Sequence, residues 1–174
     1  MDLKYALLII DAQVNMFEGA SLYQSEHIIK VIKSLIKKAR SLNVPVIWIR
    51  NNGDLGEPDE HGTNGWEINP ILEPKKGDIV IDKHNPDSFK DTDLKSILNR
   101  KNITDLIIAG MQTEICISST VKRAVELGYN VTLVEDGHST FDSDDVKASH
   151  IIEEKNKELG AISKILKEKF IAFN

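Results

Sequence analysis

Short, mostly apolar runs alternate along the chain with longer segments in which apolar residues recur every three or four positions. Runs of this length are typical of strands that helices cover on both faces of a sheet, because no polar side chain alternates with the apolar ones. The pattern predicts five strands, at residues 5–10, 44–49, 78–82, 104–109 and 130–135.

Helical periodicity is clearest in the segment that follows the first predicted strand. Ser25 is a candidate N-cap, and the apolar residues between 28 and 39 then fall on one stripe with lysines between them. We therefore expect a helix that covers the sheet. Four further helical segments are predicted: one that begins at Asp91, one that Thr113 caps and Gly128 ends, one that Ser143 caps and that runs to Leu159, and a last piece at 162–170.

This order of elements predicts the architecture. Strands that alternate with helices form a parallel sheet with helices on both faces. At 174 residues the chain is long enough for one well-buried core. We predict a single domain over residues 1–174, with a three-layer α/β/α fold and a mainly parallel, Rossmann-like central sheet. Residues 51–77 are rich in glycine and proline, and we expect a long functional loop there with one short helical turn.

Composition narrows the range of partners. The chain carries 22 Lys+Arg and 27 Asp+Glu, a formal charge of -5, and has no basic run, so we expect a small-molecule substrate rather than a nucleic acid. Its first apolar run is too short to span a membrane. The single cysteine cannot form an internal disulfide, which suits a reducing compartment. We expect a cytoplasmic protein with no membrane partner.

Three reactive side chains follow three different predicted strands: Asp11, Lys83 and Cys116. In parallel α/β sheets, ligands bind beyond the carboxyl ends of the strands, so these residues are expected at one edge. There a carboxylate can accept a thiol proton, and a lysine can stabilise the resulting charges. Taken one at a time, Asp11 and Lys83 are also explained as solvated strand ends, and Cys116 as a small buried side chain.

The position of Cys116 predicts a reactive thiol. It falls three residues after Thr113, near the start of the predicted helix. The positive end of the helix dipole and the unpaired N–H groups of a first turn favour thiolate over thiol. We therefore expect a lowered pKa for Cys116.

Several longer motifs resemble one known family. They are LLIIDAQ with Asp11, VIDKHNPDSF with Lys83, GMQTEICISSTVKRAVELGY with Cys116, and VTLVEDGHST, and GTNGWEINPIL precedes the lysine motif. In this order and spacing the chain is similar to the isochorismatase-like cysteine hydrolases, which include nicotinamidases and N-carbamoylsarcosine amidase. The resemblance covers nearly the whole chain.

The resemblance implies a mechanism. Asp11 is expected to accept and later donate a proton, Lys83 to be its electrostatic partner, and Cys116 to be the nucleophile that forms a thioester. It also implies a cis peptide bond between Met111 and Gln112, which aims the backbone N–H groups of Gln112 and Cys116 at a developing oxyanion. The expected activity is hydrolysis of an amide, carbamoyl or related carbon–nitrogen bond without a cofactor, in a homo-oligomer such as a dimer or tetramer.

Four residues are expected to contact the substrate: Gln13, Phe17, Trp66 and Ile115. Phe17 and Trp66 lie in regions where the family clamps planar substrates, although aromatic side chains also commonly fill cores. Gln13 is expected to orient the substrate or Asp11, with a solvated loop glutamine as the alternative. The three histidines at 84, 138 and 150 are expected at the surface or at helix caps.

A metal site is not expected. Nicotinamidases carry an Asp-His-His site in the loop after the second strand, and Asp54 and His61 are the only nearby candidates in this loop. Such a site normally needs three protein ligands. This difference also weakens nicotinamide as the substrate.

Two other functions remain open. The family's isochorismatases cleave a vinyl ether and do not need the cysteine, so the presence of Cys116 favours carbon–nitrogen hydrolysis. The second alternative is a non-catalytic, small-molecule-binding oligomeric relative that keeps the fold and the pocket.

Overall fold

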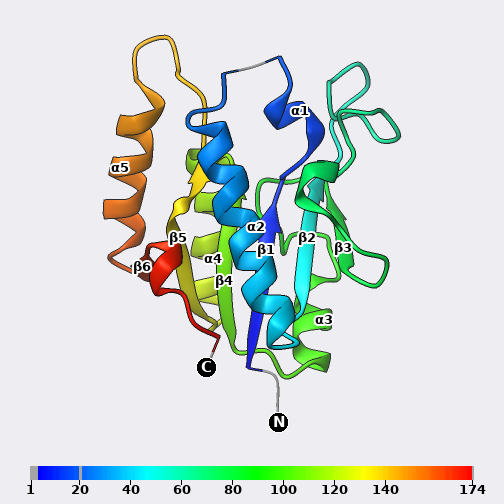
Figure 1. Cartoon of the computed structure of the whole chain (residues 1–174), viewed down its shortest axis with the longest axis vertical. Helices are drawn as coiled ribbons and strands as arrows, with labels where there is room; N and C mark the ends of the chain where they lie inside the picture. Colours follow the sequence, from blue (N-terminus) through cyan, green and yellow to red (C-terminus); the bar gives the residue numbers. More distant parts are fainter. Residues whose placement is uncertain (1–3, 20, 174) are drawn as a thin grey trace.

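The computed structural model describes residues 4–19 and 21–173. Within these residues, six parallel strands form one sheet in the order β3-β2-β1-β4-β5-β6, and helices cover both of its faces (Figure 1). The predicted three-layer, Rossmann-like fold is confirmed, since this is the doubly wound strand order. The strands are β1 (Tyr5–Ile10), β2 (Val46–Asn51), β3 (Ile79–Lys83), β4 (Asp105–Met111), β5 (Asn130–Ser139) and β6 (Lys164–Leu166).

The helices divide the core into two layers. One apolar cluster lies between the sheet and α2, and the other lies between the sheet and a second layer that contains α3 and α4. A short helix, α1, follows β1 directly, and α5 connects β5 to β6. The helices are α1 (Val14–Phe17), α2 (Ser25–Ser41), α3 (Leu94–Arg100), α4 (Ser118–Glu126) and α5 (Ala148–Leu159), with 3-10 turns at Pro70–Leu72 and Glu168–Phe170 and a π-helical turn at Thr113–Ile117.

Packing rather than capping stabilises α2. The residue before it, Gln24, has a left-handed conformation, and its side chain makes no capping hydrogen bond. Ser25 is therefore the first helical residue and not the N-cap that the sequence predicts. The predicted apolar stripe is buried against the sheet, and Ile32 and Leu35 are fully inaccessible. Burial of one such side chain contributes about 1.5–3 kcal/mol, which exceeds the value of a single cap.

The C-terminal segment differs most from the sequence prediction. A helix at 162–170 is wrong, because β6 pairs in parallel with β5 and only a 3-10 turn follows it. The open edge of β5 offers backbone partners to this segment, and that pairing outweighs a local helical preference. Beyond β6, Glu168 accepts a hydrogen bond from the hydroxyl of Ser34 and forms an ion pair with Lys38. These two contacts join the segment to α2.

Two other helices begin later than predicted. The hydroxyl of Ser143 forms a short turn with Val146, and α5 starts at Ala148, whose N–H donates to the carboxylate of Asp142. Asp91 has a positive φ of 56° and precedes α3 instead of beginning it. Before α5, a short polar turn uses the hydroxyl that was expected to cap the helix. Before α3, the hydroxyl of Thr92 donates to the carbonyl of Ser88 and accepts from the N–H of Leu94.

The direction of strand succession reverses between β1 and β4. β2 and β3 follow on one side of this point and β5 and β6 on the other. At the carboxyl end of β4, Gly110 has a φ of 127°, and a Cβ at this position would collide with the backbone of Ile10 in β1. Glycine therefore allows the two strands to approach closely where the fold is expected to bind ligands.

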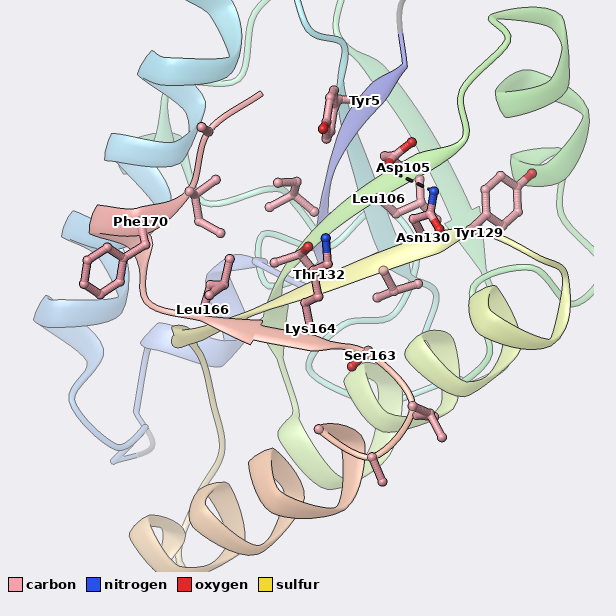
Figure 2. A pocket seen from close by; sticks show the side chains of 17 residues that line it. Tyr5, Asp105, Leu106, Tyr129, Asn130, Thr132, Ser163, Lys164, Leu166 and Phe170 are labelled. Carbon is pink, nitrogen blue, oxygen red and sulfur yellow. Dashed lines mark hydrogen bonds between the residues drawn. The ribbon is translucent and has the colours of Figure 1, made fainter. Parts of the chain in front are cut away.

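A groove opens at the opposite end of the sheet. The groove has a volume of about 420 Å³. Its lining comes from the first residues of β4 and β5 and from the C-terminal segment, including Asp105, Asn130 and Phe170 (Figure 2). Because Asp11, Lys83 and Cys116 follow the carboxyl ends of their strands, the groove is remote from them.

Candidate active site

Asp11 directly follows β1 and turns the chain away from the sheet. Its φ is 50°, a left-handed conformation that aspartate adopts more readily than most residues. Its N–H donates to the carbonyl of Ile49 in β2, and its side chain is 1% exposed. The carboxylate is thus held in a buried position at the switch in strand order.

Lys83 ends β3, two strands away from β1, and its side chain crosses over to Asp11. Its Nζ lies 3.1 Å from Asp11 Oδ2, 3.2 Å from Asn51 Oδ1 and 3.3 Å from Cys116 Sγ. A lysine ammonium has three N–H donors, so these three neighbours can satisfy it completely. The solvated strand ends considered from the sequence are excluded for Asp11 and Lys83, since both side chains are buried.

Cys116 lies in the π-helical turn between β4 and α4. π-Helical turns are rare and occur frequently at functional sites. The residue at the N-cap position is Gln112, without a side-chain cap, and the peptide bond between Met111 and Gln112 is cis. Thr113 is not the predicted N-cap, because its hydroxyl is paired with the ring of His138.

The thiol of Cys116 is protonated at rest. Burial raises its pKa to about 12, the charge of Asp11 adds to this effect, and Lys83 opposes it. The lowered pKa expected from the helix start is therefore wrong, because burial and a neighbouring carboxylate outweigh the favourable charge. Burial likewise raises the pKa of Asp11, although Lys83 and Cys116 lower it. Burial lowers the pKa of Lys83, but Asp11 and Cys116 outweigh this effect and raise it above its ordinary value.

Gln13 connects three segments around the site. Its Nε2 donates to the carbonyls of Asn51 and Trp66, and its Oε1 accepts from the N–H of Asn51. The side chain is 1% exposed, so it is not a solvated loop residue. These contacts assign Gln13 to the scaffold that holds the loop after β2 against β1.

Trp66 is enclosed by two side chains. The guanidinium carbon of Arg50 lies 3.4 Å from the ring centroid, and the His61 ring lies 4.3 Å from it. Trp66 is only 8% exposed. Trp66 Nε1 also donates to Asn52 Oδ1 at 2.6 Å. These contacts and this burial leave little of the ring surface for a substrate to stack on.

The remaining predicted substrate contacts lie on different surfaces. Ile115, which precedes Cys116 in the sequence, is 41% exposed. Phe17 in α1 is half-buried and packs against the core layer that contains α2. Ile115 thus offers an exposed apolar side chain in the turn that contains Cys116, and Phe17 remains partly exposed after the Asp11 turn.

The two metal-ligand candidates belong to no group of three potential ligands in the described part of the chain. Asp54 is exposed at a loop tip, whereas the His61 ring packs against Trp66. Over residues 4–19 and 21–173, no three carboxylate, histidine or cysteine side chains are grouped as metal ligands would be. The expectation of a metal-independent site stays a prediction.

His138 is buried and not at the surface, in contrast to the exposed His84 and His150. Its Nδ1 lies 2.8 Å from the hydroxyl of Thr113, and its Nε2 lies 2.9 Å from Asn156 Oδ1 in α5. Burial lowers its pKa from 6.5 to about 4, and Asn156 and Asp136 oppose the shift. His138 therefore links the π-helical turn to α5 as a neutral imidazole.

This neutral histidine predicts a pH-dependent stability. Its folded pKa of about 4 lies below the unfolded value of 6.5, so the unfolded chain binds the proton first as the pH falls. The stabilisation is complete above pH 6.5 and decreases towards pH 4, by about 3 kcal/mol. Urea unfolding at pH 7 and pH 4 should show that His138→Gln loses this much less stability than the wild type. Equal losses in the two proteins would contradict a buried neutral His138.

No helix in the described part of the chain combines the length and apolar character needed to cross a membrane.

The sequence did not predict two other residues beside the site, Asn51 and Asp59. Asn51 ends β2 and follows the same strand-end rule as Asp11, but the strand predicted at 44–49 stops two residues before it. Asp59 is only 9% exposed although it lies in a polar loop, and no local pattern marks it.

Comparison with known proteins identifies the family. The isochorismatase domain model matches residues 5–154. A streptothricin hydrolase from Streptomyces noursei is 33% identical over 138 residues, which cover 79% of this chain and 50% of that protein. A ureidoacrylate amidohydrolase from Enterobacter sp. (strain 638) is 27% identical over 169 residues, which cover 75% of this chain and 73% of the relative. The chain spans about half the length of the streptothricin hydrolases that it matches.

Solved structures agree with this match. The crystal structure of an isochorismatase from Pseudomonas putida KT2440 superposes with a TM-score of 0.90 at 30% identity, and the match covers 97% of this chain and 90% of that one. The residues that the family model matches include Asp11 and Cys116, and the strand order places both at the carboxyl edge of the sheet. The chain belongs to the isochorismatase family.

Proposed function

We propose that this protein is a cysteine hydrolase that cleaves a carbon–nitrogen bond of a small amide, carbamoyl or related compound through a thioester on Cys116. One observation carries the proposal. The Nζ atom of Lys83 lies within hydrogen-bond reach of both the Asp11 carboxylate and the Cys116 sulfur, in a buried cluster at the carboxyl edge of the sheet. A carboxylate, an ammonium and a thiol in mutual contact can transfer a proton and stabilise the charges that the transfer creates.

The first half-reaction uses all three groups. Asp11 accepts the thiol proton as the Cys116 sulfur bonds to the substrate carbonyl carbon, and the carbonyl electrons move to oxygen. The raised pKa values of both Asp11 and Cys116 favour transfer during the attack over a permanent thiolate. The backbone N–H groups of Gln112 and Cys116 are proposed to stabilise the oxyanion. When the carbon–nitrogen bond breaks, Asp11 donates its proton to the leaving nitrogen.

The second half-reaction releases the acid. Asp11, again a carboxylate, takes a proton from a water molecule as that water attacks the thioester carbon. The carbon–sulfur bond breaks and the sulfur recovers the proton from Asp11. Lys83 keeps its charge throughout and stabilises Asp11 while it is ionised, so each cycle consumes one water and returns the three residues to their first state.

The choice of a carbon–nitrogen bond rests on the thiol and on the relatives. A half-buried cysteine beside a carboxylate is suited to covalent acyl transfer, and the amidohydrolase among the relatives is named for cleavage of an amide-type bond. Vinyl ether cleavage gains no specific support from the geometry.

A substrate panel tests this proposal. Small primary amides, carbamoyl and ureido compounds and nicotinamide would be incubated with the purified protein, and ammonia release would be measured. We expect turnover of at least one class, together with an acyl adduct on Cys116 that mass spectrometry detects after acid quenching. A protein that binds members of the panel but never releases ammonia or acylates Cys116 would instead support the non-catalytic alternative.

Asp11→Asn is expected to have opposite effects on turnover and on the alkylation rate of the Cys116 thiol. The substitution removes the proton acceptor, so we expect turnover to fall by about 10²-fold or more. It also removes a charge that raises the pKa of Cys116, so alkylation of the thiol by iodoacetamide at pH 9 should become faster. Asp54→Asn changes an exposed carboxylate in a nearby loop and should leave both rates unchanged. Slower alkylation in Asp11→Asn would contradict the assigned contact between these two groups.

A further inference from the structure

Asn51 and Asp59 form a second polar pair next to Lys83. Asn51 ends β2 and accepts a hydrogen bond from Lys83 Nζ at 3.2 Å, and its Nδ2 donates to Asp59 Oδ2 at 2.7 Å. Asp59 comes from the long loop after β2 and is 9% exposed. A continuous chain of contacts therefore runs from Asp59 through Asn51 and Lys83 to the thiol.

Asp59 and Lys83 together determine the orientation of the Asn51 side-chain amide that lies between them. An ionised carboxylate only accepts hydrogen bonds, and a lysine ammonium only donates them. The Asn51 amide can satisfy both neighbours in one orientation, with its oxygen towards Lys83 and its nitrogen towards Asp59. Without Asp59, rotation of the amide by 180° would direct an N–H group at the ammonium.

The loop is shaped to bring Asp59 to this place. Gly53 N–H donates to the Asp59 carbonyl at 2.8 Å, which closes the loop. A Cβ at Gly53 would collide with Asp59 Oδ1. The absence of a side chain at position 53 thus provides the space that the Asp59 carboxylate occupies.

We propose that Asp59 is a positioning residue, which acts through Asn51 to hold the Lys83 ammonium between Asp11 and Cys116. The proposal rests on the catalytic function proposed for this cluster. Asp59 also places a second negative charge near Asp11, whose other charged and titratable neighbours are Lys83 and Cys116. Asp59 therefore makes Asp11 a stronger base, in addition to orienting the lysine.

Alkylation of the single cysteine reports this effect without a substrate. Since Asp11 and Cys116 share contacts, one proton can reside on either group, and loss of the first proton from the pair creates a small thiolate population. The rate of iodoacetamide alkylation, followed by mass spectrometry, should thus rise through the pKa of Asp11, level off, and rise again near the pKa of the thiol. The pH at which the lower rise occurs is the quantity compared between variants.

Asp59→Asn tests the charge. The introduced amide can still accept from Asn51 through its side-chain oxygen, but the negative charge is lost and Asp11 becomes a weaker base. We expect the lower rise to move to more acid pH by about 0.5–1 unit. Asp54→Asn, which changes an exposed carboxylate of the same loop, is the matched control and should not move it. An unchanged lower rise in a folded Asp59→Asn protein would overturn the proposal.

Gly53→Ala displaces Asp59 without changing any charge. The new methyl group pushes the carboxylate away from Asn51, so the orientation of Lys83 should be lost and the plateau rate should change by about tenfold. Asp59→Ala should change the plateau in the same direction, and circular dichroism would confirm that each variant is folded. A purely structural role would alter the melting temperature but leave both the plateau and the lower rise in place.

The same experiment separates this proposal from the function on which it rests. If Asp11→Asn abolishes the lower rise but Asp59→Asn does not move it, the proton-transfer pair stands and only the role of Asp59 is wrong. If the lower rise persists in Asp11→Asn, it does not belong to Asp11, and the proposed proton transfer itself fails.

Discussion

Cys116→Ala is expected to reduce kcat/KM by about 10⁴-fold or more on any substrate identified in the panel, because a covalent nucleophile has no substitute in this chain. The sequence contains one cysteine, so no second thiol can take over. Asp11 and Lys83 would remain paired in the variant, and their contact does not need the sulfur. Ammonia release and acylation, measured at several substrate concentrations, would check the loss.

The fold of Cys116→Ala should remain intact. The side chain is half-buried and forms no disulfide, so removal of its sulfur should cost about 1 kcal/mol of unfolding free energy. Ser119→Ala, in the first turn of α4, changes a side chain of similar size close by and should keep full activity. If Cys116→Ala retained activity at the wild-type level, the thioester mechanism would be wrong and vinyl-ether-type chemistry without the thiol would become the better explanation.

Strand ends explain why Asp11 and Lys83 could be predicted from the sequence. Asp11 is the first residue after β1, and Lys83 is the last residue of β3. In a parallel sheet the carboxyl ends of all strands lie at one edge. The strand order then determines which ends meet. β1 lies at the centre of the sheet and β3 at its edge, and the long lysine side chain spans the distance between them.

The pKa of Cys116 could not be predicted in the same way. A helix start is a local feature and suggests a lowered pKa. The structure adds burial and the carboxylate of Asp11, which is far away along the sequence, and these raise the pKa to about 12. The long-range contribution outweighs the local one, and only the fold reveals it.

Asp59 illustrates a second limit. An aspartate in a loop rich in glycine and proline has the sequence pattern of a solvated residue. Its burial depends on the missing side chain at Gly53 and on the hydrogen bonds through which Gln13 holds this region against β1. None of these conditions follows from hydrophobic periodicity, so the loop could be predicted as functional while its contribution to the site could not.

Lys83→Met is expected to lower the free energy of unfolding by about 3–5 kcal/mol at pH 7, because it leaves the Asp11 carboxylate buried without its cation. Both side chains are almost inaccessible, so water cannot replace the lost partner. Lys33→Met, which removes a surface lysine paired with Glu73, is the control and should change stability by about 0.5 kcal/mol or less. Urea unfolding of the three proteins would measure the difference.

The pH dependence of this variant identifies Asp11 as the cause. Burial raises the folded pKa of Asp11 and Lys83 lowers it, so loss of the lysine raises that pKa further above the unfolded value of about 3.9. A carboxyl group with a raised folded pKa stabilises the fold below its unfolded pKa, and this stabilisation is lost as the pH rises through the folded pKa. Lys83→Met should therefore lose stability relative to wild type from pH 4 towards pH 8. Asp11→Asn combined with Lys83→Met should abolish this slope and recover most of the stability, because a neutral amide can be buried without a cation; a slope that persists in the double variant would mean that another group is left unpaired.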